Sequence, residues 1–201
     1  GWTTYERCSA ELGASFKLAL ARWKLVIDTT DEEGNEEGGA KRRLPTTPAR
    51  MEKLLESRKF TNGADKAAVL NLYTKTATNV LGTVAHLSFK GMPLKHDDEW
   101  RSPLQLAEAL NYCSGLKELK LEATRLNDEG MQDLFGGLDR GALPELIYLG
   151  LDLNRFDEHG ITALCEAFGR GVAPKLQTLV MRLSLFGDEG AKAVADAVRL
   201  G

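Results

Sequence analysis

Few side chains in this 201-residue sequence have the types and spacing that catalysis or metal binding requires. The three histidines (His86, His96 and His159) are far apart in the chain, and only His96 lies in a dense group of metal-ligating types, His96-Asp97-Asp98-Glu99. Because adjacent residues point in divergent directions, this group is interpreted as a solvated acidic loop, with a metal site as the less favoured alternative. His159 is interpreted as an ordinary turn residue.

Nucleophiles and phosphate-binding loops are equally scarce. No G-x-x-x-x-G-K-[ST] motif occurs, and the glycine-rich segment 34–41 lacks both the Gly-Lys pair and a preceding hydrophobic strand. No serine or cysteine lies in a nucleophile elbow or beside a fixed base. Acidic pairs such as Asp128-Glu129 and Asp188-Glu189 recur at equivalent positions, which favours a helix-capping role. The sequence therefore predicts a non-enzymatic protein without a cofactor or metal.

The composition of the chain excludes several classes of protein. The 26 basic and 29 acidic residues give a formal charge of -3, which argues against a general nucleic-acid binder. Cys8, Cys113 and Cys165 are too scattered for a disulfide framework. No run of about 18 apolar residues predicts a transmembrane helix. We expect a soluble intracellular protein, in the cytoplasm or in an organelle after loss of a targeting peptide. Peripheral association with a membrane complex is compatible with this.

The chain repeats itself with a period of 30 residues. Three 23-residue segments, beginning at Leu116, Leu146 and Leu176, superpose without gaps. The leucines at the first position of each segment are followed by apolar residues at fixed offsets, and a glycine closes each predicted turn: Leu119, Leu121, Leu126 and Gly130; Leu149, Leu151, Phe156 and Gly160; Leu179, Met181, Phe186 and Gly190.

Each repeat changes its hydrophobic period internally. Alternation around the first leucines predicts a short strand, and the spacing of Met131, Leu134, Phe135 and Leu138 predicts a helix. A degenerate unit precedes the three, with Val84, Leu87, Phe89 and Leu94 at an offset of 32 residues. Its connection between strand and helix is four residues longer than in the later units. Residues 84–201 are therefore expected to form one domain of about four units.

The pattern L-x-x-L-x-L, followed by a polar residue, a further apolar position and a helix, resembles the leucine-rich repeat family, most closely its ribonuclease-inhibitor-like subclass. The resemblance implies an α/β solenoid with a short parallel β-sheet on the concave side and helices on the convex side. The family's asparagine position holds Asn154 in one unit only; it is Met92, Thr124 or Ser184 in the others. We therefore expect a weakened ladder of buried side chains.

Residues 1–83 do not repeat and are predicted to form a helical amino-terminal arm and cap. We expect a helix from about residue 4 to about residue 25, a charged linker at about residues 28–46, and a short helix starting at Thr47-Pro48. A third helix, about residues 64–80, is predicted to bury a stripe of Ala68, Leu72, Ala77 and Val80. This region would cover the first repeat. As an alternative, the first helix, with Trp2 and Trp23, would dock on another protein.

The residues between the strand leucines would face outward and form a binding surface. They vary in charge and size from unit to unit while the leucine frame stays constant, which is typical of protein recognition. With Ser88 and Gly150, the candidates are His86, Lys90, Glu118, Lys120, Glu122, Tyr148, Asp152, Thr178, Val180 and Arg182. The last repeat reaches Gly201 without a cap in its sequence, so its end is a further expected contact surface.

These features predict a non-catalytic protein-protein interaction module, a structural or adaptor subunit of a larger complex. It would bind one or more proteins through the concave face, the amino-terminal helix or the uncapped end, and would not bind nucleic acid. Two alternatives come from the resemblance. One is a GTPase-activating regulator similar to Ran GTPase-activating protein, with Arg101 as its arginine. The other is a protein inhibitor that wraps around an enzyme.

Overall fold

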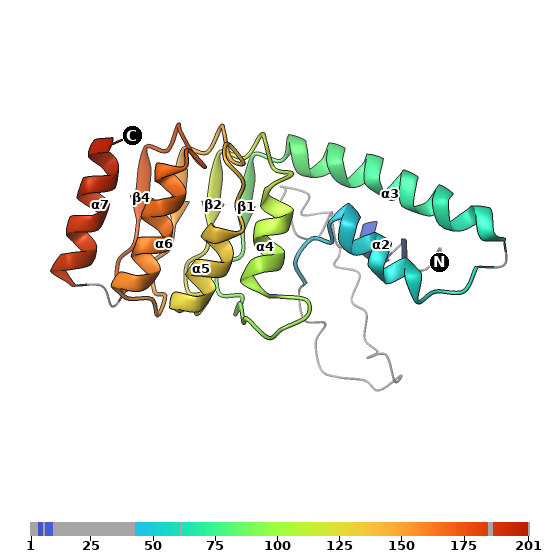
Figure 1. Ribbon diagram of the computed structural model, residues 1–201, viewed down its shortest axis with the longest axis horizontal. Helices are drawn as coiled ribbons and strands as arrows, with labels where there is room; N and C mark the ends of the chain where they lie inside the picture. Colours follow the sequence, from blue (N-terminus) through green and yellow to red (C-terminus); the bar gives the residue numbers. More distant parts are fainter. Residues whose placement is uncertain (1–3, 6, 10–42, 61, 185–186, 201) are drawn as a thin grey trace.

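The computed structural model describes residues 4, 5, 7–9, 43–60, 62–184 and 187–200 (Figure 1). Within these residues, helices and short strands follow one another in this order: α2 (Pro48–Glu56), α3 (Gly63–Thr83), β1 (His86–Ser88), α4 (Pro103–Leu110), β2 (Glu118–Lys120), α5 (Asp128–Gly136), β3 (Tyr148–Gly150), α6 (Glu158–Gly169), β4 (Thr178–Val180) and α7 (Asp188–Leu200). Trp2, Trp23 and most of the predicted first helix and linker lie outside the described residues.

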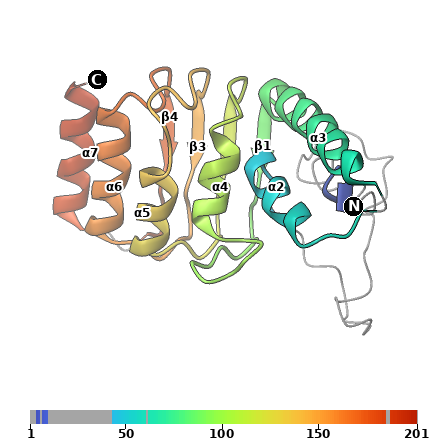
Figure 2. The same cartoon turned by 45° about the vertical axis from the view of Figure 1, so that its right-hand side comes forward.

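The four strands form one parallel sheet in chain order, β1-β2-β3-β4. The pairing is in register with the repeats, because Leu87, Leu119, Leu149 and Leu179 are successive Cα partners. Helices α4 to α7 lie side by side on one face of this sheet (Figures 1 and 2). The predicted mixed α/β fold, with a short parallel sheet and helices on one side, is confirmed.

Leucines from the strands and the inner faces of the helices form the core. Leu87, Leu119 and Leu149 are each 1% exposed, and they pack with buried helical residues such as Leu134 and Leu164. Full burial of a side chain of this size contributes about 1.5–3 kcal/mol. Leu179 and Met181, in the last unit, are only partly buried, so the core residues near α7 are less completely buried than those of the earlier units.

Polar residues start the helices, and the acidic pair Asp128-Glu129, for which a capping role was predicted, lies in the first turn of α5 next to the capping residue. The side chains of Ser102, Asn127 and Asp157 accept hydrogen bonds from backbone N–H groups in the first turns of α4, α5 and α6. The interpretation of Gly130 and Gly160 as turn-closing residues was wrong, because both lie in the first helical turn. A Cβ on Gly160 would lie 2.7 Å from Phe156 Cβ and 2.8 Å from Asp128 Oδ1. The glycine therefore allows consecutive units to approach closely.

A left-handed backbone conformation recurs where the chain leaves each strand. Ala123, Leu153 and Leu183 have φ angles of 57°, 59° and 58°, and Gly91 occupies the corresponding place in the first unit with 73°. For a residue with a Cβ, this conformation costs roughly 1–2 kcal/mol. Its repetition at 30-residue steps shows that the turn geometry belongs to the repeat rather than to any one residue.

Asn154 joins two consecutive units through buried hydrogen bonds. Its Nδ2 donates to the carbonyls of Leu121 (2.9 Å) and Leu151 (2.8 Å), and its Oδ1 accepts from Leu126 N (3.0 Å). At the equivalent positions, Met92 has no polar group and the buried Ser184 hydroxyl has no hydrogen-bond partner. The buried side-chain hydrogen bonds at the asparagine position are thus concentrated between the units that contain β2 and β3.

The buried stripe of α3 differs from the predicted one. Val69, Tyr73, Ala77 and Leu81 are fully buried, whereas Leu72 is 43% exposed and Ala68 is exposed. The helix carries small or apolar residues on several sides, so its sequence pattern did not single out one face. Its carboxyl-terminal end lies next to β1, and the rest of the helix projects away from the sheet (Figures 1 and 2).

The end of the predicted linker is part of the core. Leu44 and Thr46 are fully buried, Leu44 N donates to Trp100 O (3.1 Å), and the Tyr73 hydroxyl donates to Thr46 O (2.8 Å). The described beginning of the chain also packs here, since Cys8 is buried and Tyr5 makes an edge-to-face contact with Tyr73. Segments from residues 5 to 81 thus share one continuous core with the repeats.

Among the described helices, none is long and apolar enough to cross a membrane.

Candidate functional site

The outward positions of the four strands form one continuous surface, here called the sheet face. Its first row is His86, Glu118, Tyr148 and Thr178, and its second is Ser88, Lys120, Gly150 and Val180. A third row, where the strands end, is Lys90, Glu122, Asp152 and Arg182. Because side chains alternate along a strand, burying the leucines turns these residues to the opposite side. The structure therefore brings together ten of the twelve candidate binding residues; Trp2 and Trp23 lie outside the described part.

Glu118 organises the first two rows. Its carboxylate contacts His86 Nδ1 at 3.0 Å and Lys120 Nζ at 2.7 Å. The hydrogen bond from Lys120 holds the pKa of Glu118 below its usual value, and the same bond raises the pKa of Lys120. Lys120 Nζ also lies 5.8 Å from the centre of the Tyr148 ring. The four side chains form a connected charged and aromatic group across β1, β2 and β3.

Asp152 and Arg182 make the firmest contact of the third row. Arg182 Nη2 and Nε donate to Asp152 Oδ2 at 2.9 and 3.1 Å, and Arg182 N donates to Oδ1 at 2.6 Å. Burial opposes ionisation of Asp152, but the hydrogen bonds from Arg182 outweigh it and lower the pKa. The Arg182 side chain is nevertheless 80% exposed, so its orientation is fixed while its surface stays accessible.

Gly150 allows the Glu122 carboxylate to approach the backbone in the middle of the sheet face. A Cβ at this position would lie 2.7 Å from Glu122 Oε1 and 3.2 Å from Tyr148 Cε1. The Glu122 carboxylate therefore lies over the glycine backbone, and its Oε2 is buried with no hydrogen-bond partner. Glu122 and Asp152 thus form an acidic centre between Lys90 and Arg182 in the third row.

Neither the histidine of the sheet face nor Cys113 or Cys165 has the surroundings of a nucleophilic site in the described part of the chain. The His86 ring makes its described hydrogen bond to Glu118 and none to a hydroxyl or thiol in the described part of the chain. Burial raises the pKa of the Cys113 thiol to about 12 and also raises that of Cys165, so neither is an activated nucleophile. Fixed ion pairs beside a half-buried tyrosine and an exposed arginine are features of protein interfaces.

Two exposed leucines at the rim of the sheet face escaped the sequence analysis. Leu153 and Leu183, each one residue beyond the third row, are 52% and 77% exposed. Both have the left-handed conformation described above. The repeat alignment placed them in equivalent positions, but the hydrophobic pattern could not show that these leucines turn outward.

The group His96-Asp97-Asp98-Glu99 does not converge on one point. His96 Nδ1 contacts Asp133 Oδ2 of α5 at 2.5 Å, and the hydrogen bond raises the pKa of His96. Asp98 instead accepts from Trp100 N and pairs with Arg101 at 2.8 Å. The Arg101 side chain, only 20% exposed and engaged by Asp98, is held within its own loop.

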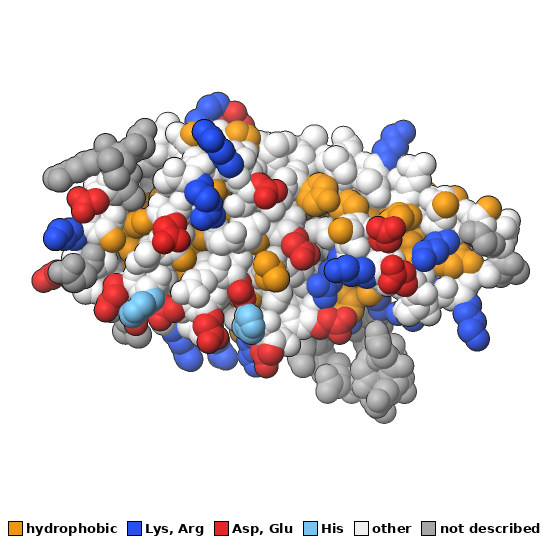
Figure 3. Space-filling model, viewed as in Figure 1, with side chains coloured by type: hydrophobic (Ala, Val, Ile, Leu, Met, Phe, Trp, Pro, Cys, Tyr) orange, Lys and Arg blue, Asp and Glu red, His pale blue; other side chains and the backbone are white. Residues whose placement is uncertain are grey.

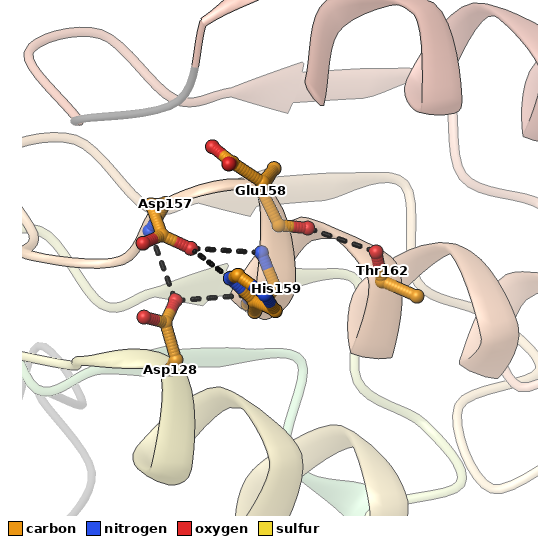
Figure 4. A network of polar contacts seen from close by, with 6 residues as sticks. Asp128, Asp157, Glu158, His159 and Thr162 are labelled. Atoms are coloured by element: carbon orange, nitrogen blue, oxygen red, sulfur yellow. Dashed lines mark hydrogen bonds and ion pairs between the residues drawn. The ribbon is translucent and has the colours of Figure 1, made fainter. Parts of the chain in front are cut away.

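A different group of ligand types does come together. Carboxylate oxygens of Asp128 and Asp157 and a ring nitrogen of His159 lie within 4.8 Å of one another (Figure 4). Asp128 Oδ1 accepts from Asp157 N and Gly160 N, both at 2.9 Å, and Asp157 caps His159 N at 2.8 Å. These hydrogen bonds link the beginning of α5 to the beginning of α6, which explains why the three side chains lie together.

The same edge of the molecule is rich in acidic groups. Figure 3 shows Asp and Glu side chains and two histidines gathered along the lower edge, below α5 and α6. Asp128 and Glu129 lie in the first turn of α5, and Glu158 lies in that of α6. Acidic groups stabilise the positive ends of helices, so this concentration follows from the parallel stacking of the units.

No protein-family model matches the chain, and no curated protein matches its sequence.

Proposed function

We propose that residues 84–201 form a leucine-rich repeat solenoid of the ribonuclease-inhibitor-like subclass. Three features support this assignment: the parallel strands in chain order, the 30-residue spacing and the buried Asn154 between units. In such an array each unit contacts only its neighbours, so the sheet face stays constant while its outward side chains vary.

We further propose that the protein is a non-catalytic protein-protein interaction module, a structural or adaptor subunit that binds its partner through the sheet face. The observation that supports this function is the fixed ion pair between Asp152 and the exposed Arg182, close to Tyr148 and to the Glu122 carboxylate over Gly150. Tyrosine and arginine are frequent hot-spot residues. Holding them in place before binding lowers the entropy cost of association.

The charge pattern suggests a partner with alternating charges rather than one strongly charged patch. The third row reads positive, negative, negative, positive, in the order Lys90, Glu122, Asp152, Arg182. A uniformly acidic or basic partner would meet like charges somewhere along this row, which is unfavourable. The exposed Leu153 and Leu183 add apolar area at the rim.

The test is quantitative affinity capture from the native source, with the wild-type chain and two matched variants. Tyr148→Ala/Arg182→Ala alters the sheet face, and Glu166→Ala/Lys192→Ala alters exposed positions of α6 and α7. We expect the face variant to lose a specific partner that the helix variant retains, with unchanged circular dichroism for both. A partner retained equally by both variants would place binding elsewhere on the molecule.

A further inference from the structure

Three arginines from distant parts of the chain surround the Trp100 ring. Their guanidinium carbons lie 4.4 Å (Arg43), 5.2 Å (Arg50) and 5.7 Å (Arg7) from the ring centre. Trp100 belongs to the long connection between β1 and α4, so this cluster joins the amino-terminal region to the first repeat. It lies away from the strands that form the sheet face.

Two arginines of the cluster, Arg7 and Arg50, carry positive charge that their described neighbours do not neutralise. Neither Arg7 nor Arg50 forms an ion pair with a carboxylate in the described part of the chain. Glu99 offers Arg50 only its backbone carbonyl, and the nearby Asp98 is already paired with Arg101. Like charges that converge on one ring repel each other. An anion between them would remove this repulsion.

Several hydrogen-bond donors of the cluster are also unused. Among the residues that the structure describes, Arg7 Nε and Nη2 and Arg50 Nε are buried without an acceptor, and the Thr46 hydroxyl is buried without a partner. Buried polar groups are normally paired, so unpaired donors indicate an absent partner. Arg50 lies in the first turn of α2, the positive end of that helix. The unpaired donors and the positive end of α2 favour the same type of ligand, a hydrogen-bond acceptor with negative charge.

From this geometry we propose that Arg7, Arg43 and Arg50 form a binding site for the phosphate group of a ligand, with Trp100 as its floor. Guanidinium groups match phosphate oxygens with paired hydrogen bonds. A phosphate monoester carries up to two charges and three strong acceptor oxygens. A single carboxylate has one charge and two oxygens, so it offers less charge and fewer acceptors to the unpaired groups of Arg7 and Arg50. Trp100 and the arginines are half-buried, so part of these side chains is accessible to a ligand from solvent.

Occupancy of this site would strengthen the connection between the arm and the repeats. The arginines come from residue 7, residue 43 and α2, whereas Trp100 belongs to the first unit. A ligand that binds the folded arrangement and not the unfolded chain raises the stability of the fold. Phosphate is therefore expected both to bind near Trp100 and to raise the melting temperature.

Trp100 itself provides the measurement. In a Trp2→Phe/Trp23→Phe background, Trp100 is the remaining tryptophan, and its fluorescence is followed during titration with inorganic phosphate at constant ionic strength, set with chloride. We expect a saturable change and a higher melting temperature. A parallel titration with phosphoserine separates the two sources of the group, since tighter binding of phosphoserine indicates an esterified phosphate and equal binding indicates free phosphate. Acetate that binds as tightly as phosphate would overturn the assignment.

Matched variants test the residues. Arg7→Gln/Arg50→Gln is expected to weaken phosphate binding by at least about tenfold, because charge-assisted hydrogen bonds are lost. Arg50→Lys keeps the charge, and its affinity for phosphate is expected to lie between that of the parent and that of Arg7→Gln/Arg50→Gln. Arg140→Gln removes an exposed arginine elsewhere and should bind as the parent does. Unchanged affinity in the double variant, with a native circular dichroism spectrum, would overturn the site, as would a non-saturable response of the parent. Tyr148→Ala should leave phosphate binding intact.

Discussion

Thr124 and Asn154 hydrogen-bond to each other across two consecutive repeats. Thr124 Oγ1 lies 3.1 Å from Asn154 Oδ1 and 2.9 Å from Leu121 O, and both side chains are buried. Asn154 also satisfies backbone groups of both units, so the pair replaces backbone hydrogen bonds that the turns after β2 and β3 cannot make. This junction places two hydrogen-bonded polar side chains in a core that is mostly apolar.

Replacing Asn154 is therefore expected to be costly. Asn154→Ala leaves Leu126 N and the carbonyls of Leu121 and Leu151 without their side-chain partner. We expect a loss of about 3 kcal/mol in the free energy of unfolding, because unsatisfied buried groups cost about 1–3 kcal/mol each. Urea denaturation measures it. Thr124→Val removes fewer hydrogen bonds, so it should lower the free energy of unfolding by less than Asn154→Ala. A larger loss in Thr124→Val would contradict the proposed role of Asn154.

Two glycines of α5 and α6 should respond in opposite directions to alanine. In Gly160→Ala the new methyl group would meet Phe156 Cβ and the Asp128 carboxylate, so we expect a destabilisation of about 1–3 kcal/mol. Gly136, at the exposed end of α5, has nothing within 4 Å. Gly136→Ala should stabilise the protein by about 0.4–1 kcal/mol through the unfolded chain. Thermal denaturation of both variants tests this, and similar effects would argue against close packing at Gly160.

His96 and His159 should titrate above their usual pKa of 6.5, because the hydrogen bonds that their rings donate to Asp133 and Asp157, respectively, favour the charged rings. For a raised pKa, the stabilisation is fully present below pH 6.5 and is lost as the pH rises through the higher pKa of the folded state. Proton NMR of the imidazole signals measures both values. Asp133→Asn should lower the pKa of His96 alone, and Asp157→Asn that of His159 alone. A single variant that shifts both rings equally would contradict this pairing.

The thiols should differ in their reaction with iodoacetamide. Cys113 is fully buried with a pKa of about 12, and Cys165 is only partly buried. At pH 8 the native protein should be alkylated at Cys165 well before Cys113, because reaction needs an accessible thiolate. Mass spectrometry of tryptic peptides follows each site without substitutions. In denaturant both should react at similar rates, and faster native labelling of Cys113 would contradict its burial.

Most of the repeat region could be predicted because its information is local. Alternating leucines specify the strands, the spacing around Met131 and Leu134 specifies a helix, and acidic residues such as Asp128 mark where a helix begins. Since these signals recur every 30 residues, equivalent outward residues had to line up across the strands. The sheet face from His86 to Arg182 follows from that alignment alone.

The amino-terminal region did not follow from local patterns in the same way. The stripe of α3 is selected by what packs on it, including the contact of Tyr73 with Thr46, a residue assigned to a linker because its neighbours are charged. Likewise, the sequence marked His96-Asp97-Asp98-Glu99 as the ligand-type cluster, whereas the structure gathers Asp128, Asp157 and His159. Contacts between separate elements depend on how those elements assemble.

The sequence by itself determined the period, the strands and helices of the repeats and the residues that turn outward, because each depends on side chains a few positions apart. Only the tertiary structure decided that Leu44 is buried, that Leu153 and Leu183 are exposed and that three arginines meet at Trp100. These features join residues tens of positions apart, and their positions are set by packing and by buried hydrogen bonds that no hydrophobic period encodes.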